Sequence, residues 1–203
     1  MSQATWIHRF VRPVVRPLAR AGVTPNQVTT VRLGLGLGAA ALAAWGDAMA
    51  LQLGALVFLI AFLLDRVDGL LARETGKSSV FGHRYDLASD TICTALIFLG
   101  LGIGLRDGPL GWWSAVLGGI AGISVVTVLW LVLRREAAAG LRAGELRPLA
   151  GFDPDDAMIL VPIGIWLQQS WPFLWAAAIG TPLFVVFFVW RLRRRALGTN
   201  PAG

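Results

Sequence analysis

Long apolar stretches alternate along this chain with short polar segments that carry most of its charge. Six apolar stretches can be marked, at residues 28–46, 50–64, 87–105, 112–133, 157–167 and 173–190. A helix needs about 20 residues to cross the hydrocarbon core of a bilayer. The second, third and fifth stretches are short by that measure, and each needs part of its polar flank to reach across. The pattern predicts an all-α integral membrane protein with six transmembrane helices.

The composition supports a membrane protein and excludes several other classes. Of the 203 residues, 56% are hydrophobic and 15% are charged, whereas a soluble domain carries about 25% charged residues. A chain this apolar is also not a disordered one. Its single cysteine, Cys93, allows neither an internal disulfide nor a cysteine zinc site. We expect one domain over residues 1–203, with a surface helix at 3–21 and a six-helix bundle at 28–195.

The basic residues predict how the chain lies in the membrane. Residues 6–20 are rich in arginine with apolar residues at helical spacing, which is typical of an amphipathic helix on the membrane surface. The net charge of +6 comes from clusters between the apolar stretches, not from a stripe that would bind nucleic acid. One of the 18 Lys and Arg residues, Arg106, falls in the three turns expected outside. The bias predicts both termini on the cytoplasmic side of the inner membrane.

Four aspartates lie at or inside the predicted helix ends around residues 65–90. Asp65 and Asp68 are three residues apart, and Asp86 and Asp90 are four apart, so each pair shares one face of its helix. A short connection makes the two helices antiparallel neighbours. Ionisable groups inside a membrane are costly and usually functional. We therefore expect all four carboxylates to converge near the cytoplasmic interface.

The chemistry of this cluster points to metal ions and phosphate. Converging carboxylates repel one another unless cations lie between them, and no Lys or His occupies a matching helical position. Hard oxygen ligands favour Mg²⁺ or Mn²⁺, and two such ions can hold the oxygens of a reacting phosphate. Gly69 and Gly82 leave room for a ligand near the backbone, and Arg73 lies one turn beyond Asp68, where it can meet a phosphate.

These residues form a pattern, Asp-x2-Asp-Gly-x2-Ala-Arg-x8-Gly-x3-Asp-x3-Asp, that resembles the CDP-alcohol phosphotransferase signature at every fixed position. The eight fixed positions within 26 residues are Asp65, Asp68, Gly69, Ala72, Arg73, Gly82, Asp86 and Asp90. The family has a surface helix followed by six membrane helices, so the resemblance covers nearly the whole chain. The Thr-Pro-Asn-x2-Thr segment at 24–29 and the basic loop with Arg134, Arg135, Arg142 and Arg147 also resemble the family. The Glu-Ala-rich turn into Gly140-Leu141-Arg142 resembles its phosphatidylinositol-phosphate synthase branch.

The resemblance implies a reaction and roles for particular residues. An acceptor alcohol would displace CMP from a CDP-alcohol, commonly CDP-diacylglycerol, in phospholipid biosynthesis, and the enzyme would be a homodimer. Asp65, Asp68 and Asp86 would bind two Mg²⁺ or Mn²⁺ ions, while Asp90 would contact one metal and take the proton of the attacking alcohol. The residues matching donor contacts are Asn26, Thr29, Gly69, Arg73, Ser79 and Gly82.

The sequence leaves open which alcohol is the acceptor. The basic candidates Arg134, Arg135, Arg142, Arg147 and Arg191 suit an anionic acceptor such as inositol phosphate or glycerol phosphate. However, the phosphatidylinositol-phosphate synthase branch begins its fifth span with a Glu-Arg-Pro-Glu-Arg type segment, and this chain has Phe-Asp-Pro-Asp-Asp at 152–156. These acids either cap a helix or bring Asp155 or Asp156 to the acceptor. In the second case a free polyol, an amino alcohol or a lipid alcohol is favoured.

Two other classes make different predictions. A proton-coupled transporter also uses intramembrane acids, but it would take up solute along a pH gradient and release no CMP. An inactive membrane scaffold predicts the loss of at least one acid, and none is missing. Aspartates that only cap helix ends would not explain Asp90, which is the deepest of the four. We therefore favour the transferase.

Overall fold

The computed structural model describes residues 6–139 and 158–198, and this part of the chain is helical without strands. Five of the described helices are long and apolar enough to cross a membrane, namely α2, α3, α4, α5 and α7. The helices are α1 (Trp6–Arg20), α2 (Pro25–Trp45), α3 (Ala48–Thr75), α4 (Val80–Gly104), α5 (Trp113–Ala139), α6 (Leu160–Trp166) and α7 (Ser170–Gly198).

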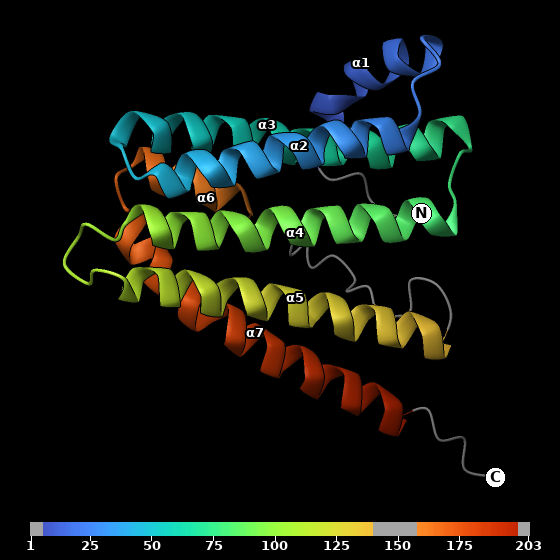
Figure 1. The fold of residues 1–203 in the computed structure, drawn as a ribbon. Helices are drawn as coiled ribbons and strands as arrows, with labels where there is room; N and C mark the ends of the chain where they lie inside the picture. Colours follow the sequence, from blue (N-terminus) through green and yellow to red (C-terminus); the bar gives the residue numbers. More distant parts are fainter. Residues whose placement is uncertain (1–5, 140–157, 199–203) are drawn as a thin grey trace.

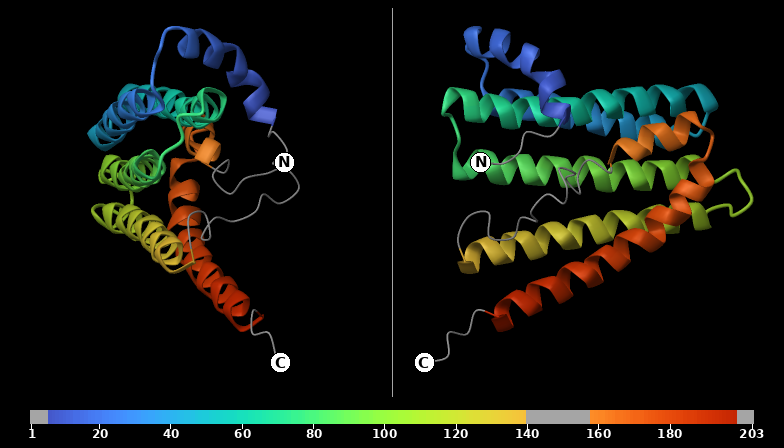
Figure 2. Two further views of the ribbon diagram at one scale, coloured as in Figure 1. Left: turned by 90° about the vertical axis from the view of Figure 1, so that its right-hand side faces the viewer. Right: turned by 180° about the vertical axis from the view of Figure 1, so that it is seen from behind.

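The long helices lie side by side with roughly aligned axes (Figure 1). Helix α2 packs on both α3 and α4, α4 packs on α5, and α5 packs on α7. Helix α1 lies across one end of the bundle against α3, and α7 ends at that same end, as the right-hand view in Figure 2 shows. Helix α6 is a short segment at the opposite end.

Local sequence signals decide where the helices near the acidic segment begin and end. The backbone N–H of Thr24 donates to Gln27 Oε1 at 2.9 Å, with Pro25 in the first turn of α2. Ser79 Oγ accepts from the backbone N–H of Gly82 at 2.9 Å and caps α4. Gly76, with φ of 65°, ends α3 in the left-handed conformation. The connection between α3 and α4 is therefore short, as predicted, and the helices run antiparallel, but each packs mainly on α2 and they touch each other little.

Small residues let α4 pack closely between its neighbours. A Cβ added at Gly100 would overlap the Ala40 carbonyl of α2, and one added at Gly118 of α5 would overlap the Phe98 carbonyl of α4. Such contacts are typical of membrane helices, where close backbone approach replaces hydrophobic collapse. The core at this level includes Ile97, Phe98 and Leu101. This packing fixes the rotation of α4 and so the direction in which its aspartates point.

Large apolar side chains cover the outer faces of the long helices. Ile123, Leu183 and Val186 are at least 63% exposed, as expected of residues that face lipid. Trp45, Trp112 and Trp113 are also exposed and lie at helix ends, where tryptophan is enriched at membrane interfaces. The chain is therefore a multi-pass membrane protein.

The predicted spans agree with the structure except at the fifth. Helices α3 and α4 have 28 and 25 residues because they continue into their polar flanks. The residues predicted to form a surface helix are helical as α1, and its fully buried Val15 packs with Val67 and Leu71 of α3. In place of the span at 157–167, the described part contains only the seven residues of α6. The flank that this span needs lies in 140–157, outside the described residues.

Candidate active site

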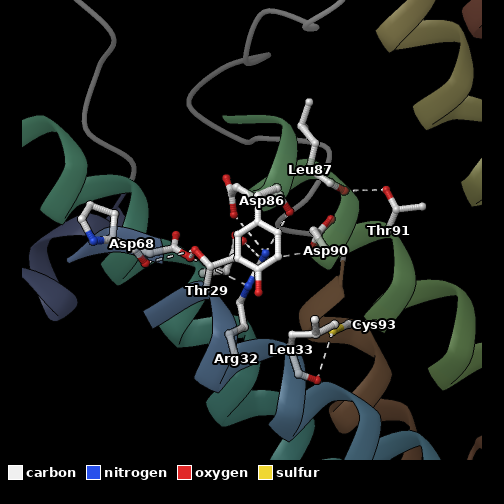
Figure 3. Close-up of polar contacts among 12 residues, drawn as sticks. Thr29, Arg32, Leu33, Asp68, Asp86, Leu87, Asp90, Thr91 and Cys93 are labelled. Atoms are coloured by element: carbon white, nitrogen blue, oxygen red, sulfur yellow. Dashed lines mark hydrogen bonds and ion pairs between the residues drawn. The ribbon is translucent and has the colours of Figure 1, made fainter. Parts of the chain in front are cut away.

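The four aspartates converge, as the sequence predicts, at the end of the bundle nearest α1. One carboxylate oxygen from each of Asp65, Asp68 and Asp86 lies within 4.8 Å of the other two. We call these three residues the carboxylate triad. Asp90 follows one turn further along α4 and points toward the same space (Figure 3). Two residues of the triad come from α3 and one from α4, and both helices pack mainly on α2, so the geometry depends on how α2 holds them.

Arg32 of α2 lies among these carboxylates, and the sequence analysis did not anticipate it (Figure 3). Its side chain is 2% exposed, its Nη1 contacts Asp65 Oδ1, and its Nη2 lies 2.9 Å from Asp86 Oδ1. Nη1 is also 3.6 Å from Asp90 Oδ1, and Nε is 3.9 Å from Asp68 Oδ2. The sequence did contain a sign of this role, because Arg32 lies inside an otherwise apolar stretch, where an ionised side chain needs a partner.

Asp68 is the most buried member of the triad, at 2% exposed. Its Oδ2 accepts a 2.7 Å hydrogen bond from Thr29 Oγ1. Its Oδ1 is buried without a hydrogen-bond partner among the described residues. A buried carboxylate oxygen left without a partner is costly, and a divalent cation would supply one. The oxygen-only ligand set and its close spacing therefore fit Mg²⁺ or Mn²⁺.

A cavity of about 580 Å³ opens over the triad and changes character along its length. Its polar end is formed by the start of α2, the end of α3 and the start of α4. Its apolar end is formed mainly by α5 and α7, through Val128, Leu129, Phe184 and Phe188. The cavity can therefore hold a ligand with one polar and one apolar part.

All six residues that match donor contacts line this cavity, namely Asn26, Thr29, Gly69, Arg73, Ser79 and Gly82. The two glycines differ in their surroundings. A Cβ at Gly69 would meet nothing within 4 Å, so the backbone there faces open space. A Cβ at Gly82 would come within 3.1 Å of Asn26 Oδ1 and 3.0 Å of Ser79 Oγ. Gly82 thus allows the start of α4 to approach the start of α2.

The basic acceptor candidates lie away from this cavity in the described part of the chain. Arg134 is exposed and its guanidinium carbon lies 3.7 Å from the centre of the Trp130 ring. Arg135 Nη2 donates to the Leu192 carbonyl at 2.7 Å, which ties α5 to α7. Neither of them, nor Arg191, is among the cavity-lining residues. The remaining candidates, Arg142, Arg147, Asp155 and Asp156, lie outside the described residues.

A histidine and a glutamate join α4 to α5 at the cavity wall. His83 Nε2 lies 2.8 Å from Glu136 Oε1, and the Glu136 side chain is 1% exposed. His83 itself lines the cavity. Its place among the variable positions of the motif gave no signal of this contact, because the partner is 53 residues away in sequence.

A cluster of carboxylates beneath an amphipathic cavity, set among membrane-length helices, fits a membrane enzyme that acts on a phosphate bearing both a polar and an apolar group. The chain belongs to the CDP-alcohol phosphatidyltransferase family, whose model matches residues 22–183. It is thus a phosphotransferase for substituted phosphate groups, and the resemblance inferred from the motif is confirmed.

Its relatives include several phosphatidylinositol phosphate synthases. The chain is 29% identical to the one from Mycolicibacterium smegmatis over 210 residues, covering 99% of this chain and 89% of the relative. It is 33% identical to that of Mycobacterium marinum, covering 82% and 78%. It also resembles the solved Mycobacterium tuberculosis phosphatidylinositol phosphate synthase with CDP-DAG bound, with a TM-score of 0.67 and 27% identity over 89% of this chain and 92% of that one. The same enzyme in complex with manganese and citrate gives a TM-score of 0.65, 27% identity and 88% coverage of each chain.

Proposed function

We propose that this enzyme transfers the phosphatidyl group of CDP-diacylglycerol to an alcohol, with release of CMP. The observation that carries the proposal is the position of the carboxylate triad beneath a cavity that is polar at one end and apolar at the other. CDP-diacylglycerol has the same division between nucleotide diphosphate and acyl chains. The bound CDP-DAG in the Mycobacterium tuberculosis relative supports this choice of donor.

Asp65, Asp68 and Asp86 would hold the metal, as a pair of Mg²⁺ or Mn²⁺ ions. The unpartnered Oδ1 of Asp68 and the manganese in a related structure support a divalent cation. When bound, such ions supply positive charge to the diphosphate oxygens and to the departing CMP.

The remaining cavity residues would hold and activate the substrates. Arg73 and Lys77 line the polar end, where they can pair with the phosphates. Asn26, Thr29, Gly69, Ser79 and Gly82 would contact the rest of the donor. Asp90 lines the cavity with its side chain 44% exposed, so it can take the proton of the acceptor hydroxyl. The acceptor oxygen then bonds to the phosphorus bearing diacylglycerol, while the bond from that phosphorus to the CMP oxygen breaks.

Inositol phosphate is the first acceptor to test, because the relatives that cover most of the chain are phosphatidylinositol phosphate synthases. Other acceptors must also be tested, because the segment at 152–156 is acidic and because none of Arg134, Arg135 and Arg191 lines the cavity. These are glycerol phosphate, free polyols, amino alcohols and lipid alcohols.

We further propose six membrane crossings, with both termini and the site at the cytoplasmic face of the inner membrane. Helix α5 ends at the end of the bundle where α1 lies, whereas α7 begins at the opposite end (Figure 1). The end of α5 and the start of α7 thus lie at opposite ends of the bundle, which supports a sixth crossing that includes α6. The concentration of Arg and Lys at the α1 end supports the orientation. A homodimer, implied by the family resemblance, stays a prediction.

CMP release tests the function directly. Purified protein in lipid nanodiscs would receive CDP-diacylglycerol, Mg²⁺ or Mn²⁺ and one acceptor at a time. We expect acceptor-dependent CMP release that stops on chelation with EDTA, and no release by Asp86→Asn. CMP release by the unaltered protein in EDTA would contradict the metal role. Absence of CMP release with every acceptor would contradict the proposed function.

A further inference from the structure

We propose that Arg32 is a built-in counter-cation of the acidic cluster, which holds the metal-free site together and competes with the divalent cation for Asp65 and Asp86. The inference rests on the proposed metal role of the carboxylate triad. It concerns how the site is kept assembled before the metal binds, and it makes Arg32 a residue that sets metal affinity.

The contacts of Arg32 join three helices through one side chain. From α2, its Nη1 contacts Asp65 of α3, and its Nη2 reaches both Oδ1 and the backbone carbonyl of Asp86 in α4, each at 2.9 Å. The guanidinium is planar with donors in a fixed fork, so it can bridge two carboxylates in this way. Its side chain is 2% exposed, which means that it cannot exchange these partners for water.

Charge balance explains why the cluster needs such a residue. Four carboxylates, from Asp65, Asp68, Asp86 and Asp90, lie within 4 Å of atoms of this one cation. Without a cation the carboxylates of α3 would repel those of α4. A buried charge that loses its partner is strongly destabilising. Arg32 therefore makes the empty site compatible with a folded bundle.

The same contacts place Arg32 in competition with a metal. The residues that it pairs with most closely, Asp65 and Asp86, are two members of the carboxylate triad. An oxygen that accepts from the guanidinium cannot at the same time use that lone pair for a metal. Metal binding must therefore weaken one or both contacts, so the affinity of the site is lower than that of the carboxylates alone.

The structure leaves room for the guanidinium to move aside. A small cavity of about 20 Å³ borders Arg32, Asp65, Asp90 and Cys93, which is space for about one water molecule. Asp90 Oδ1 lies 3.6 Å from Nη1. A shift toward Asp90 would keep Arg32 paired while it releases the triad. The charge of Arg32 then stays balanced in both states.

Two measurements without turnover test this role. Mn²⁺ binding would be followed by electron paramagnetic resonance of the free ion, and unfolding by tryptophan fluorescence on heating, in EDTA and in saturating Mn²⁺. The variants are Arg32→Gln, which removes the charge, and Arg32→Lys, which keeps it without the fork. Arg106→Gln is the matched control, because Arg106 donates to the Ala44 and Ile103 carbonyls at the far end of the bundle.

We expect Arg32→Gln to bind Mn²⁺ about tenfold more tightly than the unaltered protein, as loss of one competing ion-pair partner implies. Its melting temperature should fall in EDTA and recover in Mn²⁺, whereas Arg106→Gln should show the same change in both. Arg32→Lys should lie between, and it carries the test if Arg32→Gln does not fold.

The proposal would be overturned if the Arg32 variants bound Mn²⁺ no more tightly than the unaltered protein. It would also be overturned if their melting temperature fell equally with and without Mn²⁺. If Mn²⁺ binding still depends on Asp86 in that case, the proposed function stands and only the role of Arg32 fails. If the unaltered protein binds no more Mn²⁺ than Asp86→Asn does, the metal role fails, and the competition proposed for Arg32 fails with it.

Discussion

The Thr29 hydroxyl lies 2.7 Å from Asp68 Oδ2 and donates to it, which joins the first turns of α2 to the acidic face of α3. Both side chains are 2% exposed. Thr29 also belongs to the Thr-Pro-Asn-x2-Thr segment that matches donor contacts. One residue thus contacts the donor cavity and orients a proposed metal ligand, which couples the two halves of the site.

Thr29→Val tests this coupling because it removes the hydroxyl and keeps the shape. Asp68 would then have both oxygens buried without a hydrogen bond from α2, at a cost of about 1–3 kcal/mol. We expect a lower melting temperature in EDTA and weaker Mn²⁺ binding, both measured as for Arg32. Thr127→Val is a suitable control, because its exposed hydroxyl bonds only to the Ile123 carbonyl one turn earlier among the described contacts. An unchanged Mn²⁺ affinity would mean that Thr29 does not orient Asp68.

Gly69→Ala probes the donor site with a single methyl group. The added Cβ would project into the cavity without touching the protein, so folding should be unaffected apart from a small gain in helix propensity. We expect weaker CDP-diacylglycerol binding, seen as a raised KM for the donor. Gly34→Ala, where a Cβ also meets nothing within 4 Å but away from the cavity, is the control. An unchanged donor KM in Gly69→Ala would show that the donor does not approach this backbone.

Arg73→Ala separates donor binding from metal binding. Arg73 lines the polar end of the cavity and is not a member of the carboxylate triad. Loss of one charge-assisted contact to a phosphate should weaken donor affinity by about 10- to 100-fold, with Mn²⁺ affinity close to that of the unaltered protein. Titration with CDP-diacylglycerol in nanodiscs measures the first, and electron paramagnetic resonance measures the second. If the donor affinity of the variant matched that of the unaltered protein, Arg73 would not contact the donor phosphate.

The acidic cluster could be predicted from the sequence because its geometry is local. Spacings of three and four residues put Asp65 with Asp68 and Asp86 with Asp90, and a short connection pairs their helices. Arg32 is different, because it is 33 residues from Asp65 and no local spacing relates the two. Its contact depends on how α2 rotates against α3 and α4, which glycine packing such as Gly100 on Ala40 decides.

The basic acceptor candidates show a second limit of sequence patterns. A cluster at 134–135 predicts which end of α5 is cytoplasmic, but not which way each side chain turns. Arg135 bonds to the Leu192 carbonyl and Arg134 stacks on Trp130. Trp130 lies one turn before Arg134 on α5 itself, whereas the partner of Arg135 depends on how α5 and α7 pack. The same limit applies to α6, because its apolar residues alone do not predict where this helix begins.

His83→Ala should change how the enzyme treats the acceptor. The variant removes a cavity-lining imidazole and its 2.8 Å contact to the buried Glu136 carboxylate. The imidazole lines the cavity and Glu136 does not, so loss of the imidazole exposes an anionic acceptor more fully to the negative charge behind it. We therefore expect a higher KM for the acceptor and an unchanged KM for the donor. The double variant His83→Ala with Glu136→Gln should restore part of the acceptor affinity. A rise in donor KM alone would instead place this pair beside the nucleotide.

Asp90→Asn should abolish most catalysis while it preserves most metal and donor binding. Asp90 is not among the three carboxylates whose oxygens lie within 4.8 Å of one another, and its side chain is 44% exposed and lines the cavity. Asparagine keeps the shape and an oxygen but cannot accept the proton of the attacking hydroxyl. Loss of a general base typically costs about 10²–10⁴-fold in rate. Acceptor-dependent CMP release measures that loss, and Mn²⁺ and donor titrations measure what is retained. Asp86→Asn is the comparison, because it should lose Mn²⁺ affinity as well as rate. Near-normal CMP release by Asp90→Asn would show that another group takes the proton.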